Sequence, residues 1–75
     1  MWKVIVYCSA EAWQQQATVF LEIAGKYPGT LLASRKIKGD ERREMEYEFE
    51  DANDAESLVQ EAMTIEGFTA IFEST

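Results

Sequence analysis

The chain contains no histidine, one cysteine, Cys8, and one proline, Pro28. A single cysteine excludes an internal disulfide, and the absence of histidine removes the usual base that activates a cysteine nucleophile. We therefore expect Cys8 to be a small buried residue at the end of a strand. No stretch is long and apolar enough for a membrane span or a signal peptide, so the expected location is cytoplasmic.

Basic residues are also scarce, and none follows Arg43. Five of the seven lysines and arginines lie between Arg35 and Arg43. The rest of the chain carries only acids: Glu44, Glu46, Glu48, Glu50, Asp51, Asp54, Glu56, Glu61, Glu66 and Glu73. The formal net charge of −7 disfavours direct binding to nucleic acid, because such binding depends on Lys and Arg displacing counterions. A basic protein surface is the expected partner.

What the chain does have is enough apolar content for a folded core and one clear period-two pattern. The 75 residues are 47% hydrophobic, which predicts a single compact domain over residues 1–75. In residues 43–50, large apolar residues alternate with glutamates. This period predicts a strand with Met45, Tyr47 and Phe49 on its buried face and the glutamates on the other face.

Five further elements can be placed around this strand. Residues 2–8 are rich in β-branched and aromatic residues and predict a central strand. Ser9 is a suitable N-cap for a helix that ends near Ala24 or Lys26, with Gly25 as its C′ residue. Asn53 and Glu56 resemble a capping box at the start of a second helix. The predicted apolar faces of the helices are Trp13, Ala17, Val19, Phe20, Leu21, Ile23 and Ala24 in the first, and Ala55, Leu58, Val59, Ala62 and Met63 in the second, which Gly67 closes before a strand at residues 68–72.

Residues 30–38 predict another strand, joined to the glutamate strand by a turn at Gly39-Asp40. Two registers remain open. A two-residue loop places Leu32 opposite Tyr47 and Arg35 opposite Glu44, whereas a three-residue loop places Ala33 opposite Tyr47 and Lys36 opposite Glu44. Either register gives the glutamates a cation from the neighbouring strand.

The order strand, helix, strand, strand, helix, strand resembles the ferredoxin-like βαββαβ fold, an α+β fold with both helices on one face of a four-stranded antiparallel sheet. The resemblance implies the strand order 4-1-3-2, in which the glutamate strand is interior. The helix-free face, called the open face below, then carries the glutamates beside these residues: Lys3, Ile5, Tyr7, Thr69, Ile71 and Glu73.

No arrangement of residues typical of catalysis or cofactor binding is recognisable. The exposed glutamates lack the burial or specific partner that general acid–base catalysis requires, so we expect no enzyme. Glu50, Asp51 and Asp54 offer oxygen ligands, but no EF-hand spacing is present, and acids at a helix N-terminus suit the macrodipole. The four glycines fall at element boundaries and form no phosphate loop. We expect no metal and no cofactor.

Two functional hypotheses follow. The first is a small acidic protein-binding module that docks on a basic surface, specifically an inhibitor of a nucleic-acid-binding protein, by analogy of size, charge and fold with phage anti-CRISPR and anti-restriction proteins. Its predicted partner-binding residues are Glu44, Glu46, Glu48, Glu50, Asp51, Asp54 and Tyr7. The alternative is a regulatory domain similar to ACT domains, which binds a small molecule and forms a homodimer through the open face.

Ile5, Tyr7 and Ile71 would be buried between the subunits of that homodimer. RNA recognition, another function of ferredoxin-like domains, is disfavoured because the glutamates occupy a central strand where such domains place aromatic residues. The basic turn formed by Lys36, Lys38, Arg42 and Arg43 is either a second contact site or a device against edge-to-edge aggregation.

Overall fold

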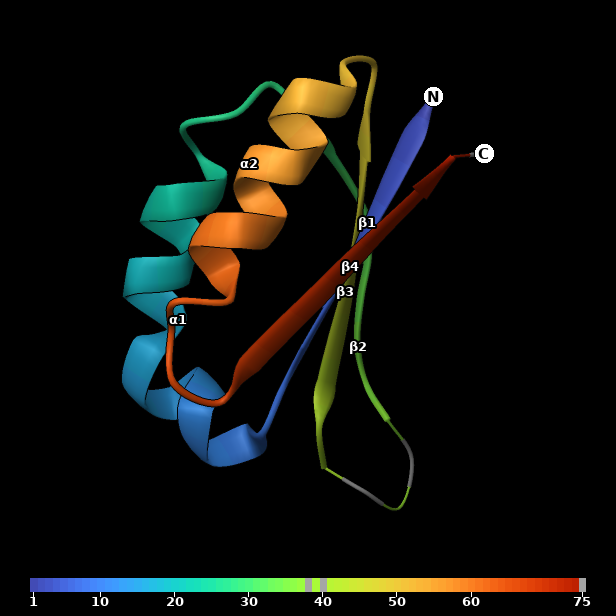
Figure 1. The fold of residues 1–75 in the computed structure, drawn as a ribbon. Coiled ribbons are helices and arrows are strands. Elements are labelled where there is room, and N and C mark those ends of the chain that lie inside the picture. The colour runs from blue at the N-terminus through green and yellow to red at the C-terminus, as the bar shows by residue number, and fades with distance from the viewer. Residues whose placement is uncertain (38, 40, 75) are drawn as a thin grey trace.

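The computed structural model describes residues 1–37, 39 and 41–74 and has the predicted order of elements (Figure 1). The six elements are β1 (Trp2–Cys8), α1 (Ala10–Ala24), β2 (Thr30–Lys36), β3 (Arg43–Phe49), α2 (Ala52–Ala62) and β4 (Phe68–Ser74). The strands form one antiparallel sheet in the order β2-β3-β1-β4, so the predicted ferredoxin-like fold and strand order are confirmed. No helix among the described residues is long and apolar enough to cross a membrane.

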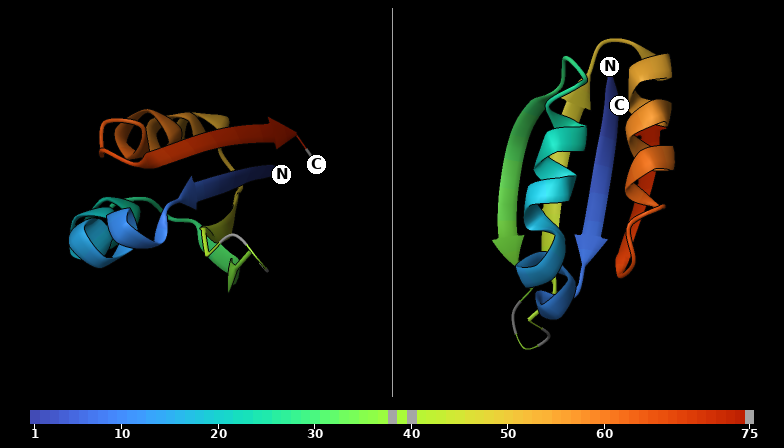
Figure 2. Two further views of the ribbon diagram at one scale, coloured as in Figure 1. Left: turned by 90° about the horizontal axis from the view of Figure 1, so that it is seen from below. Right: turned by 90° about the vertical axis from the view of Figure 1, so that its left-hand side faces the viewer.

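Both helices lie on one face of the sheet, with α1 over β3 and α2 over β4 (Figure 2). The other face is uncovered, and the glutamates of β3 point toward it. The two connections that flank β3 lie at opposite ends of the molecule: the β2–β3 turn at one end and the β3–α2 connection at the other (Figure 1). The basic residues around the β2–β3 turn and the acids that follow β3 therefore lie at opposite ends of the molecule.

The core lies between the helices and the sheet and is built around Phe20 of α1. The Phe20 ring stacks on Phe68 at 5.4 Å between centroids and meets Tyr47 edge-on at 6.1 Å. The alternation predicted for β3 is confirmed, because Met45, Tyr47 and Phe49 are buried. The other buried hydrophobic residues are Val4, Val6, Cys8, Ala12, Ala55, Leu58, Ala62, Ile65, Phe68 and Ala70.

The first helix begins as predicted, but its buried face is narrower than predicted. Ser9 caps α1 by accepting a hydrogen bond from the backbone N–H of Ala12 at 3.0 Å. Val19 and Leu21 are 43% and 52% exposed, because they lie on the flanks of the helix, on either side of Phe20. Gly25 is the C-cap with right-handed φ of −67°, so the prediction of a C′ glycine is wrong there.

The second helix starts earlier than the Asn53 capping box predicts. Asp51 is the N-cap, and its Oδ1 accepts a hydrogen bond from the Asn53 N–H at 2.8 Å. The helix ends at Ala62, and Met63, predicted as part of its buried stripe, is 55% exposed. Gly67 lies in the following turn with φ of +85°, where a side chain would be strained.

The β2–β3 hairpin matches neither predicted register along its whole length. Arg35 pairs with Glu44, as a two-residue loop would require, but a bulge at Leu32 moves Leu31 opposite Tyr47. The Ile37 N–H donates to the Arg42 carbonyl at 2.7 Å. Four residues separate Ile37 from Arg42 in the sequence, so the connection is longer than the predicted two-residue turn. Gly39 has the expected positive φ of 82°, while Lys38 and Asp40 lie outside the described residues.

Candidate protein-binding surface

The predicted acid ladder lies in the middle of the open face. Glu44, Glu46 and Glu48 project from β3 between β1 and β2, and all three are half-buried. The side chains of Glu44 and Glu46 are only 18% and 19% exposed. These glutamates are therefore part of a packed surface and do not extend freely into solvent.

Two cations neutralise the first half of the ladder. Arg35, opposite Glu44 in the register, places Nη2 at 3.4 Å from Glu44 Oε1 and at 2.8 Å from Glu46 Oε1. From the other side, Lys3 Nζ lies 3.9 Å from Glu46 Oε2. The predicted neighbouring-strand cation is confirmed as Arg35, and it joins two glutamates at once.

The second half of the ladder continues into an acidic end, which we define as Glu48, Glu50, Asp51 and Asp54. Within the described part of the chain, no ion pair within 4.0 Å involves any of these four carboxylates. Glu50 and Asp51 are exposed where the chain leaves β3 for α2. The N-terminus of a helix stabilises nearby negative charge, so Asp51 and Asp54 are favoured there without a basic neighbour.

Tyr7 does not join the acidic end. It is half-buried on the open face, opposite Glu44 on one side and Thr69 on the other. Glu44 and Glu50 are six positions apart on an extended strand, which corresponds to about 20 Å. The predicted contact set is thus divided into a neutralised part, with Tyr7, Glu44 and Glu46, and the acidic end.

The described basic residues of the β2–β3 hairpin lie toward the opposite end of the molecule, which we call the basic hairpin end: Arg35, Lys36, Arg42 and Arg43. The Arg43 guanidinium carbon lies 4.6 Å from the centroid of the Trp13 ring, and its Nη1 donates to Ser34 Oγ at 3.1 Å. Lys36 is paired directly opposite Arg43. Trp13, predicted as a core residue, is only partly buried, and the Arg43 guanidinium covers one face of its ring. Ala10, Gln14 and Glu41 complete a hollow of about 150 Å³ around these three side chains.

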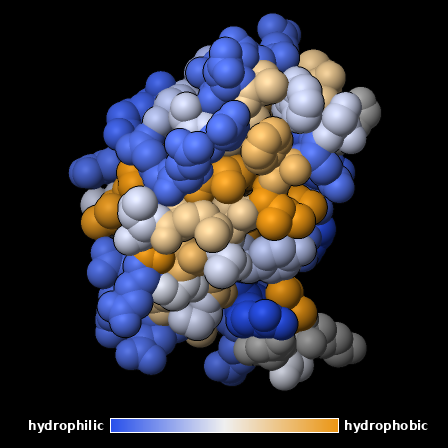
Figure 3. Space-filling model, viewed as in Figure 1, coloured by the Kyte–Doolittle hydropathy of each residue, from blue (hydrophilic) through white to orange (hydrophobic). Residues whose placement is uncertain are grey.

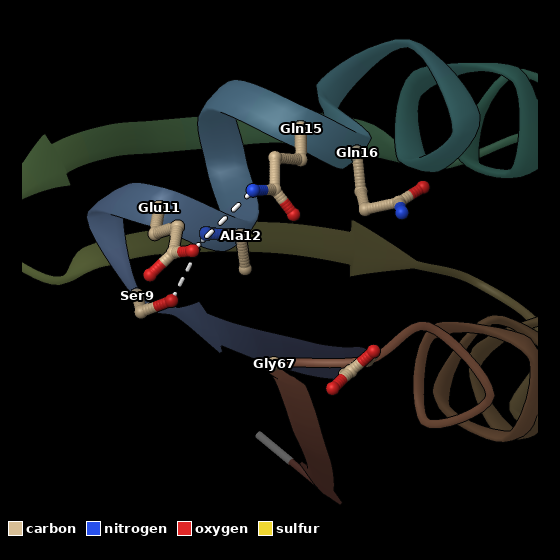
Figure 4. Close-up of a pocket in the computed structure, with 7 residues that line it drawn as sticks. Ser9, Glu11, Ala12, Gln15, Gln16 and Gly67 are labelled. Atoms are coloured by element: carbon tan, nitrogen blue, oxygen red, sulfur yellow. Dashed lines mark hydrogen bonds between the residues drawn. The ribbon is translucent and has the colours of Figure 1, made fainter.

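Another hollow, of about 200 Å³, lies at the start of α1 beside the turn that leads into β4 (Figure 4). Its polar groups largely bond to each other: Ser9 Oγ accepts from the Ala12 N–H, and Glu11 Oε1 accepts from Gln15 Nε2 at 3.3 Å. The remaining lining residues are Gln16, Glu66 and Gly67. The hollow places no nucleophile beside a base and carries no recognisable chemistry.

Cys8 is free and buried under Arg43, its cross-strand neighbour. Burial raises the pKa of the Cys8 thiol, and this effect outweighs the opposing one of the Arg43 charge and the Arg43 backbone hydrogen bond. A protonated, buried thiol is a poor nucleophile. Among the described residues, no three histidine, cysteine, aspartate or glutamate side chains are grouped so that they could hold a metal ion.

Sequence reasoning missed one long-range polar contact. The carboxylate of Glu61 in α2 accepts a hydrogen bond from Tyr27 Oη and forms an ion pair with Lys26 Nζ at 2.7 Å. These contacts connect the segment after α1 to α2. No local pattern could have indicated it, because the partners are more than thirty positions apart.

No protein-family model, curated protein or solved structure matches the chain.

Proposed function

We propose that this chain is a non-catalytic protein-binding module that docks its acidic end on a basic surface of another protein. The observation that carries the proposal is the unequal neutralisation of the β3 ladder. Arg35 and Lys3 form ion pairs with Glu44 and Glu46. Among the described residues, no ion pair within 4.0 Å involves Glu48, which lies opposite Lys3 in the register, or Glu50, Asp51 and Asp54.

The direction of docking follows from where the charges lie. The basic hairpin and the acidic end are at opposite ends of a molecule whose longest extent is 31 Å. At an ionic strength of 0.1 M, the Debye length is about 10 Å, so an approaching partner feels mainly the charges at the end it meets. A basic partner is therefore attracted to the acidic end and repelled from the hairpin end.

The partner surface that fits best is one that binds nucleic acid. Such surfaces present many lysines and arginines along a groove, because they neutralise phosphates. The carboxylates of Glu48, Glu50, Asp51 and Asp54 offer a row of negative charges to the same cations. We propose that the module occupies this groove and thereby inhibits its target.

The proposal is tested by comparing two variants of equal charge. Glu48→Gln with Glu50→Gln removes two acids from the acidic end without touching the Asp51 cap, and Glu11→Gln with Glu22→Gln removes two acids from α1. Each immobilised variant, and the natural chain, is used to capture proteins from a lysate of the native host at low salt, and the salt concentration that elutes the captured protein is measured.

We expect the first variant to release the captured protein at lower salt and to associate with it more slowly, while the α1 variant behaves as the natural chain does. Equal effects of both variants would mean that only net charge matters and would remove the acidic end from the mechanism. Inhibition is tested by competition: duplex DNA or RNA must displace the module from the captured protein, and simultaneous binding of both would contradict it.

A further inference from the structure

The two edges of the sheet differ in how they are protected. β2, one edge, carries Arg35 and Lys36 and is interrupted by the bulge at Leu32. Cationic side chains and bulges are devices by which natural proteins prevent edge-to-edge pairing. β4, the other edge, pairs with β1 in an unbroken register, and its residues 68–72 contain no charge and no proline. This edge has neither a bulge nor a charge over residues 68–72 to prevent pairing with another strand.

The hydrogen-bonding direction along β4 is fixed by one contact. The Ala70 N–H donates to Met63 Sδ at 3.3 Å, so it points away from β1. Since direction alternates along a strand, the Phe72 backbone groups also point outward. A thioether is a weak acceptor, and a backbone carbonyl from another strand would satisfy the Ala70 N–H better. The Phe68 N–H already donates to the Ile65 carbonyl at 3.1 Å, so the accessible edge begins at Ala70.

Apolar side chains line this edge on both faces of the sheet. Ile71 and Met63 are each 55% exposed. Phe72 is partly buried on the helix side, where it contacts the ring of Trp2 at 5.7 Å between centroids. Figure 3, which looks onto the β4 side of the molecule, shows hydrophobic surface across its middle. Such surface beside an unprotected edge favours an occupant that brings both a strand and apolar side chains.

We propose that the occupant is a second copy of this chain, paired antiparallel through β4 about a two-fold axis at Ile71. In this pairing the outward backbone groups of Ala70 in each copy bond those of Phe72 in the other copy. It sets Ile71 against its symmetry mate on the open face, and Ile5, directly opposite Ile71 within each copy, extends the apolar row. The small Ala70 faces the large Phe72 of the other copy.

The charges on β4 itself are compatible with this self-pairing. In the register centred on Ile71, Glu73 faces Thr69 of the other copy, so no two like charges meet across the new pair of strands. A register shifted by one residue toward the C-terminus, centred on Phe72, would instead set Ile71 against Glu73. The result is a two-fold symmetric dimer with one continuous eight-stranded sheet. This inference is independent of the proposed function, because it uses neither the acidic end nor a basic partner.

The test is a register-specific disulfide. In a Cys8→Ala background, Ile71→Cys places two thiols at a non-hydrogen-bonded pair, whose Cα atoms are about 4.5 Å apart and within reach of a disulfide. Thr69→Cys is the matched control, since it is exposed on the same face of the same strand. It lies four positions from its symmetry mate along the strand, or about 14 Å.

We expect mild oxidation to cross-link most of the Ile71→Cys protein and almost none of the Thr69→Cys protein. Equal cross-linking at both positions, or none at position 71, would overturn the register. The natural chain is also examined by sedimentation at high micromolar concentration beside Ile71→Lys, which sets two ammonium groups against each other. We expect a dimer and a folded monomer, respectively. A monomeric natural chain, or a dimer that survives Ile71→Lys, would overturn the proposal.

Discussion

The turn before β4 gives the most direct test of the packing. Gly67 has φ of +85°, and a Cβ atom added there would lie 2.5 Å from the Cβ of Ala12 in α1. Ala12 is 7% exposed and its side chain has no rotatable bond that could relieve the overlap. Gly67→Ala therefore forces the β4 turn and α1 apart.

The expected loss has two parts. A left-handed backbone costs an L-residue about 1 to 2 kcal/mol, and overpacking of a close contact adds about 1 to 3 kcal/mol. Gly39→Ala separates them, because Gly39 has φ of +82° but nothing within 4 Å of an added Cβ. We expect Gly39→Ala to lose only the backbone part, so the two variants should differ by about 1 to 3 kcal/mol in free energy of unfolding.

The measurement is urea unfolding followed by far-UV circular dichroism, with the slope compared between variants to confirm that the same surface is exposed. A double variant adds Ala12→Gly to Gly67→Ala. It should recover the overpacking part, so that its loss is smaller than the sum of the two single losses. Equal losses for Gly67→Ala and Gly39→Ala, or strictly additive effects in the double variant, would refute the close contact between the turn and α1.

Three further predictions follow from the core and the open face. Phe20→Ala, which empties a fully buried site, should cost about 3 to 5 kcal/mol in urea unfolding. Arg35→Gln should cost less than about 1 kcal/mol despite its two ion pairs, because the Arg35 side chain is 54% exposed and water screens it. Burial raises the pKa of Cys8 and of Tyr47, so the folded state keeps protons that the unfolded state loses, and thermal stability should fall as the pH rises above 9.0, the ordinary thiol value. Cys8→Ala with Tyr47→Phe should flatten that fall, and an unchanged slope would assign it to other groups.

The fold could be predicted from the sequence because strong local patterns agreed with one another. The alternation in residues 43–50 specified both the strand and its buried face, and Ser9 specified the start of α1. Predictions failed where two local solutions were nearly equal. Asp51 and Asn53 are both good caps, and the choice between them depends on how the chain leaves Phe49. The position of the bulge at Leu32 was equally hidden, since two adjacent leucines fit either face.

The candidate surface was less predictable, because tertiary packing decides which charges are paired. The sequence indicated a row of glutamates with cations nearby, but not that Arg35 would join Glu44 and Glu46. It also placed Trp13 in the core, since a tryptophan at helical spacing usually packs there. The contact between Trp13 and Arg43 forms only when α1 packs against the start of β3, and the local sequence of neither element predicts that packing.

The separation of the two proposed surfaces has a geometric consequence. The acidic end lies at the C-terminal end of β3, whereas the proposed dimer contact is centred on Ile71, halfway along an edge strand on the far side of β1. A two-fold axis through that contact reverses the direction of the strands, so it carries the acidic end of one copy to the opposite end of the joined sheet from that of its mate. The dimer would then present two separate acidic ends, one at each end of the joined sheet. Such an arrangement suits a partner with repeated basic sites, for which two linked contacts bind more tightly than one.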